Sequence, residues 1–116
     1  MKKAFKYAAS LITALAITFS CAAQDFTNQK LKLTELQIAT LPNGLHAVVG
    51  IGQNISGSVI KNNFTKINLL QNGIVIGETI DSTSNIQPNQ KWKMQAFIND
   101  LNGIPDSFTI TEVMSH

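Results

Sequence analysis

Few side chains in this sequence are of the kinds that perform catalysis or bind metals. It has one cysteine, Cys21, and two histidines, His46 and His116, in 116 residues. A zinc site needs three or four ligands, usually cysteine or histidine, and two histidines far apart in the sequence do not supply that number. His46 opens a predicted strand on its outward-facing phase, so we expect a solvated surface histidine. No metal site is predicted from these residues.

The carboxylates do not form a catalytic pattern either. Asp81, Asp100, Asp106, Glu78 and Glu112 never occur as a close pair beside other polar residues. Oxygen ligands in segment 99–106 could bind calcium, but their spacing matches no EF-hand, and Asn and Asp are also the ordinary residues of turns. No nucleophile-elbow motif accompanies any serine. We therefore expect no enzyme and no cofactor.

Trp92 is the only tryptophan and could stack against a sugar or a peptide ring. Its alternation groups it with Met94, Ala96 and Ile98, which favours a place in the core. A position in a groove is the alternative, and it would make a carbohydrate or peptide site plausible.

The first residues have the pattern of an export signal. Lys2, Lys3 and Lys6 precede the uncharged run 7–19, which is shorter than the about 20 residues of a membrane-spanning helix. We predict a helical signal peptide within residues 1–23. The protein is then exported, and is periplasmic, anchored in the outer membrane by lipid, or secreted.

Cys21 allows two readings. Ser20 suits the position before the modified cysteine of a bacterial lipoprotein, where cleavage would precede Cys21 and acyl chains would anchor the protein. Small residues also permit ordinary cleavage after about Ala23. Lipid on Cys21 is the only membrane attachment that the sequence predicts.

The charge of the chain beyond the signal argues against nucleic acid as a partner. It carries six lysines, no arginine and seven carboxylates, a net charge of −1. The lysines are scattered along the chain, whereas nucleic-acid binding favours a clustered basic face with stacking aromatics.

The remaining residues predict one all-β domain. Residues 24–30 are expected to be a short tether and 31–116 a β-sandwich. Apolar residues recur at every second position in 31–40, 45–54, 91–98 and 107–113, with a change of phase near Glu35 that predicts a bulge or a break. Asn72-Gly73 predicts a type I′ turn in a hairpin over 64–80. About six to seven short antiparallel strands indicate a sandwich.

Three motifs resemble those of the FxLYD domain, a small immunoglobulin-like module of exported bacterial proteins. Gly50 and Asn54 fit its opening strand, Leu69 and Gly73 fall in its namesake motif, and Pro88 fits its later turn. Ile67, Leu70 and Gln71 replace the other namesake residues, and Asn89 replaces a glycine. The resemblance covers residues 45–113 and implies an immunoglobulin-like sandwich.

The resemblance also implies a binding or spacer module without a known reaction. Structural roles suffice for the five matching positions, such as close strand approach at Gly50 and a turn at Pro88. We expect a non-catalytic module of the bacterial envelope, with an envelope protein or peptide as partner, bound by edge-strand pairing among other modes. The alternative is a soluble exported domain that binds a small carbohydrate or peptide.

Overall fold

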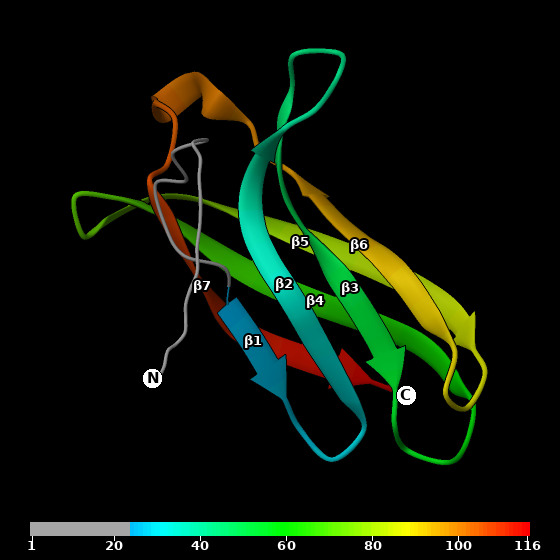
Figure 1. Cartoon of the computed structure of the whole chain (residues 1–116). Coiled ribbons are helices and arrows are strands. Elements are labelled where there is room, and N and C mark those ends of the chain that lie inside the picture. Colours follow the sequence, from blue (N-terminus) through cyan, green and yellow to red (C-terminus); the bar gives the residue numbers. More distant parts are fainter. Residues whose placement is uncertain (1–23) are drawn as a thin grey trace, which may run out of the picture.

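The computed structural model describes residues 24–116, which form seven β-strands and one short 3-10 helix (Figure 1). The signal peptide that we predict lies outside these residues. The elements are, in chain order, β1 (Gln24–Thr27), β2 (Leu31–Thr40), β3 (His46–Asn54), β4 (Ile60–Gln71), β5 (Ile74–Ile86), β6 (Lys91–Phe97), η2 (Asp100–Asn102) and β7 (Ser107–Ser115).

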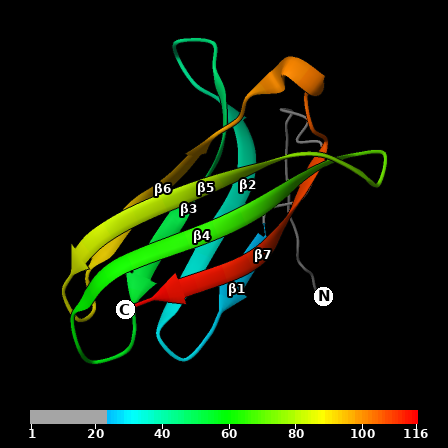
Figure 2. The same ribbon diagram turned by 180° about the vertical axis from the view of Figure 1, so that it is seen from behind.

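The strands form two antiparallel sheets that face each other, which confirms the predicted β-sandwich. One sheet has the order β1-β2-β3-β6 and the other the order β5-β4-β7. Seen from behind, the three-stranded sheet lies in front of the four-stranded one (Figure 2). The neighbours β2-β3-β6 and β4-β7 correspond to A-B-E and C-F of immunoglobulin domains, and β5 lies beside β4 as C′ lies beside C in variable domains.

The predicted tether is wrong in its first half. Residues 24–27 are strand β1, which pairs antiparallel with β2 and places Phe26 against the core. In β1 the half-buried residues Gln24 and Phe26 alternate with exposed ones, but a strand of four residues is too short for this alternation to be recognised in the sequence.

The predicted bulge in β2 is confirmed. The register between β2 and β3 shifts between Thr34 and Gln37, and Glu35 has a positive φ of 57°. The Glu35 amide donates to the carboxylate of Asp25 in β1 at 3.2 Å. The extra residue lets Leu33 and Leu36, which belong to opposite phases of a regular strand, both face the core.

The hairpin is confirmed and is longer than predicted. Asn72 and Gly73 have φ values of 53° and 81°, as a type I′ turn requires. The paired strands extend from Ile60↔Ile86 to Gln71↔Ile74 instead of stopping at residues 64 and 80. Residues 81–85 are polar, so the alternation of apolar residues does not reveal the last part of β5.

The core lies between the sheets and includes the predicted inward faces of β6 and β7. Its buried members are Leu31, Leu33, Leu36, Val48, Ile60, Ile67, Leu69, Ile86, Met94, Ala96, Ile98 and Phe108, with Trp92 and Ile110 packed against them. Trp92 is therefore a half-buried core residue, as its alternation favours.

The outward-facing phase predicted for His46 is wrong, and with it the predicted orientation of β3. Val48, Gly50 and Gly52 face the core, and the apolar phase that includes Val49 and Ile51 faces outward. The inward glycines make room for large neighbours: a Cβ on Gly50 would lie 2.7 Å from Leu36 Cδ2, and a Cβ on Gly52 would overlap the Trp92 ring. Side chains from β2 and β6 thus fill the core space that β3 leaves.

Gly52→Ala is therefore expected to lower the free energy of unfolding by about 2 kcal/mol, because the added methyl group displaces the Trp92 ring. Gly77→Ala is the matched control, since a Cβ there meets only Leu69 Cδ1, at 3.9 Å. Urea unfolding of both variants measures the difference. Equal stabilities would contradict the packing of Trp92 over Gly52.

Candidate functional site

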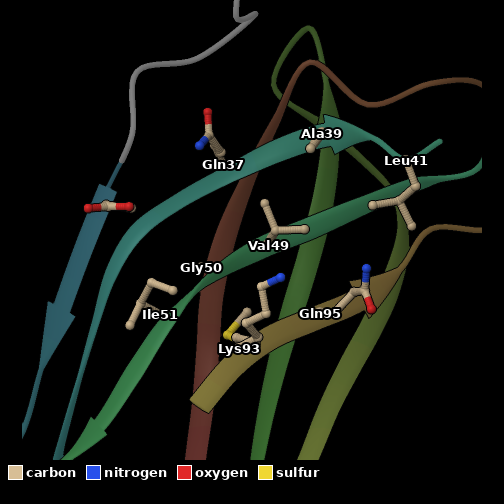
Figure 3. Close-up of a pocket in the computed structure, with 10 residues that line it drawn as sticks. Gln37, Ala39, Leu41, Val49, Gly50, Ile51, Lys93 and Gln95 are labelled. Carbon is tan, nitrogen blue, oxygen red and sulfur yellow. The ribbon is translucent and has the colours of Figure 1, made fainter. Parts of the chain in front are cut away.

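The outward face of the four-stranded sheet carries a hollow over β2, β3 and β6 (Figure 3). Cross-strand pairing sets its residues in rows. One row is Gln37, Val49 and Gln95, and the next contains Ile51 and Lys93 and continues beyond the hollow to Thr34. In each row an apolar side chain of the central strand lies between polar residues of its neighbours, so the floor of the hollow is apolar.

The remaining lining residues give the hollow a mixed character. Ala39 and Leu41 extend the apolar floor toward the end of β2, while the exposed Glu35 and Lys93 supply one charge of each sign. The volume is 340 Å³. Aliphatic contacts with amide and charged groups around them suit an extended peptide or a small polar molecule.

His46 is not the solvated surface residue that we expected. It belongs to the inward-facing phase of β3, its side chain is only 20% exposed, and Nδ1 lies 3.7 Å from Asp100 Oδ2. Nδ1 is buried and has no hydrogen-bond partner among the described residues. The orientation of β3 causes this placement, and the pair joins the start of β3 to the 98–106 segment.

Asp81 is a buried carboxylate that no sequence pattern indicated. It lies in β5 and is 8% exposed, and its Oδ1 accepts the Gln95 amide of β6 at 3.2 Å. Burial raises the pKa of Asp81, while that hydrogen bond and the nearby Trp92 indole lower it in part. Neither Trp92 Nε1 nor Asp81 Oδ2 has a partner with the geometry of a hydrogen bond among the described residues. The indole is thus a weaker partner for Asp81 than the Gln95 amide.

This carboxylate predicts a pH dependence of stability. Because the pKa of Asp81 is raised in the folded state, folding favours the protonated form, and the free energy of unfolding falls as pH rises from 3.8 through the raised value. Asp81→Asn lacks this contribution but keeps an acceptor for the Gln95 amide. We therefore expect the wild type to lose stability relative to the variant as pH rises across that range. Urea unfolding of both proteins measures the difference between their free energies of unfolding. A pH-independent difference would contradict it.

Gly50 and Asn54 of the family-like motif have separate structural places. Gly50 lies on the inward phase of β3 beneath Leu36, and its backbone contributes to the floor of the hollow. Asn54 is fully buried at the end of β3. Its Nδ2 donates to the carbonyls of Ser58 and Ile86, at 2.7 and 2.9 Å, and its Oδ1 accepts from the amide and hydroxyl of Ser56.

The other motif positions lie elsewhere in the sandwich and are not brought together with these two. Leu69 is a buried core residue of β4, and Gly73 closes the β4–β5 turn. Pro88 lies in the turn that the Gln90 amide closes on the Gln87 carbonyl, followed by Asn89 with a φ of 66°. Cys21 lies outside the described residues.

Among residues 24–116, no group of three or more His, Cys, Asp or Glu side chains is arranged to hold a metal ion. In the same range, no helix has the length and apolarity needed to cross a membrane. The residues that sequence reasoning missed are Val49, Ile51 and their row neighbours. The only relevant signal in the sequence is that both alternating faces of β3 consist largely of apolar or small residues, so the sequence does not determine which face is exposed to solvent.

Comparison of the chain with family models, with curated proteins and with solved structures found no match.

Proposed function

We propose that this chain is a non-catalytic binding module of the bacterial cell envelope, which contacts its partner through the outward face of β2, β3 and β6. The hollow around Val49 and Ile51 carries the proposal, because a solvent-facing apolar floor has no role in the core of the sandwich. The resemblance of residues 45–113 to the FxLYD domain supports the same class of function.

An envelope protein or peptide is the partner that this surface suits best. The alternate side chains Val49 and Ile51 are two residues apart on one strand, so an extended segment lying across them could place its own alternate side chains in contact with both. Glu35 and Lys93 would orient a segment that carries complementary charges. Nucleic acid is not proposed as a partner.

Edge-strand pairing is a second mode for the same partner. β4, which carries Lys61 and Lys66, is not an edge strand, because it lies between β5 and β7. The β6 edge is partly closed, since Asp81 and Thr79 of β5 bond to the backbone of Gln95 and Phe97. On the other side of the sandwich β7 is an edge strand of its sheet, and its Phe108 and Ser115 carbonyls accept from the side chains of Gln24 and Lys30.

Val49→Lys tests the binding face. We expect it to abolish the chemical crosslink between the protein and its partner in intact envelopes, because an ammonium group would lie on the apolar floor. Ile80→Lys is the matched control: Ile80 is 50% exposed on the opposite sheet. A crosslink that survives Val49→Lys would contradict the proposed face and would direct attention to the β7 edge.

A soluble exported domain that binds a small ligand, such as a carbohydrate or peptide, is the alternative that the same hollow supports. Its volume of 340 Å³ is near the lower limit of the about 300 to 1,000 Å³ typical of ligand pockets. NMR titration with a ligand panel should then shift the amides of Val49, Ile51 and Lys93 together. Shifts elsewhere in the sandwich would exclude this hollow.

Export and anchoring are part of the proposal and have their own test. The intact mass of the protein purified from its host should show either acyl groups on Cys21 or an unmodified chain that begins at about Gln24. A chain that keeps Met1 and stays in the cytoplasm would contradict export.

A further inference from the structure

Large apolar side chains gather at one end of the sandwich, on three segments that are distant in the sequence. Six of the ten exposed large hydrophobic residues described belong to this end: Leu45, Ile74, Val75, Phe97, Leu101 and Ile104. Leu101 is 86% exposed and Ile74 67%. We refer to these six residues as the apolar end. Isolated exposed aliphatic residues are ordinary, but a group of them on adjoining loops marks an interaction surface.

Hydrogen bonds hold the three segments together. Gln71 Nε2 donates to the Ile104 carbonyl at 3.3 Å, and Asn102 Nδ2 donates to the Ile76 carbonyl at 3.2 Å. The Ile98 amide donates to the His46 carbonyl at 2.9 Å, which ties in the β2–β3 loop. Figure 1 shows this loop and the 3-10 helix at the same end, opposite the β1–β2 and β3–β4 loops. The apolar end is thus a built surface rather than a set of loose loops.

The N-terminal strand leads toward this end. β2 runs toward the β2–β3 loop, and β1 is antiparallel to it, so Gln24 is the residue of β1 nearest to the apolar end. Gln24 Nε2 also contacts the Phe108 carbonyl, at 3.5 Å, just after the 98–106 segment. In the sequence, only residues 20–23 separate Gln24 from the uncharged run 7–19. Cys21 is within about 10 Å of chain from Gln24.

The charges at the apolar end indicate which kind of lipid it could meet. No lysine lies in residues 41–45, 71–76 or 97–106, and the two acidic residues there are Asp100 and Asp106. Asp106 Oδ2 accepts the Asn72 amide, and Asp100 lies beside His46. These segments thus offer no lysine or arginine to attract anionic headgroups, so we expect affinity for a bilayer to come mainly from apolar contact.

We propose that the apolar end rests on the surface of a lipid bilayer, with Leu101 and Ile104 reaching into its interface. The bilayer is the occupant that the position of β1 favours, because a membrane-tethered residue 21 would hold the apolar end against it. The six residues of the apolar end are not among those that line the hollow on the sheet face. The membrane contact would add to any lipid on Cys21 and fix the orientation of the module.

Tryptophan fluorescence with brominated lipid tests the proposal. Leu101→Trp and Ile55→Trp are made in the full chain, and the proteins purified from the host are mixed with vesicles of phosphatidylcholine or brominated phosphatidylcholine. Ile55 is 40% exposed in the β3–β4 loop at the opposite end, so it is the matched control. Trp92 is present in both variants and in the wild type, whose signal is subtracted.

We expect brominated lipid to reduce the added fluorescence of Leu101→Trp at least twofold and to leave that of Ile55→Trp unchanged. Replacing part of the lipid by phosphatidylglycerol should not increase the effect. Quenching of neither variant, or of both equally, would overturn the proposal, as would quenching that depends on anionic lipid. Val49→Lys should not alter the quenching at position 101, so failure of the binding face and failure of the membrane contact are distinguishable.

Discussion

Asn54→Ala is expected to destabilise the sandwich by about 3 kcal/mol, because the substitution leaves buried polar groups without partners. The Asn54 side chain is fully buried and bonds to the carbonyls of Ser58 and Ile86 and to the Ser56 amide. Ile86 ends β5, in the other sheet, so this one side chain joins the two sheets and also fixes the β3–β4 loop. Urea unfolding of the purified chain measures the loss.

Asn43→Ala is the control for this prediction. Asn43 is exposed and also bonds to a backbone amide two residues along, that of Leu45, at 3.0 Å. Water can replace that bond, so we expect a change within about 0.5 kcal/mol. If Asn54→Ala were as mild as Asn43→Ala, the buried bonds of Asn54 would not hold the sheets together.

Leu36→Ala is expected to cost about 3 kcal/mol, because it removes a fully buried side chain from the core. Gly50→Ala should cost about 2 kcal/mol by overpacking, since its new Cβ would meet Leu36 Cδ2 at 2.7 Å and the Thr34 carbonyl oxygen at 3.0 Å. The Leu36 side chain and a Cβ at position 50 would therefore compete for the same space, so the effects of the two substitutions should depend on each other.

The double variant measures this dependence. With Leu36 shortened, the Cβ at position 50 loses its closest contact, that with Leu36 Cδ2, so the combined loss should be smaller than the sum by about 1 kcal/mol or more. Strict additivity in urea unfolding would contradict the account of why β3 turns glycines toward the core.

The fold was largely predictable because its central turn and its bulge have clear signals in the sequence. Asn72-Gly73 defines the central hairpin, and the phase change around Glu35 locates the bulge that brings Leu33 and Leu36 to the same side. β1 was not predictable as a strand, because its position depends on pairing with β2 and on the contact between Asp25 and the Glu35 amide, which have no local sequence signal.

The candidate site was less predictable because the rule that apolar residues face inward fails in β3. Its inward face is made partly of glycines, and the volume that they leave is filled by Leu36 and Trp92 from neighbouring strands. Such a compensation depends on which strands become neighbours, so it appears only when the sheet is assembled. The same inversion moves His46 away from the surface and exposes Val49 and Ile51.

Site-specific photocrosslinking in living cells tests the central claim most directly. A photoreactive amino acid is placed at position 49 in the hollow, and in a second strain at position 80 on the opposite sheet. The proposed binding face predicts a discrete adduct with an envelope component from position 49 and none from position 80. No adduct from position 49, or the same adduct from both positions, would contradict it.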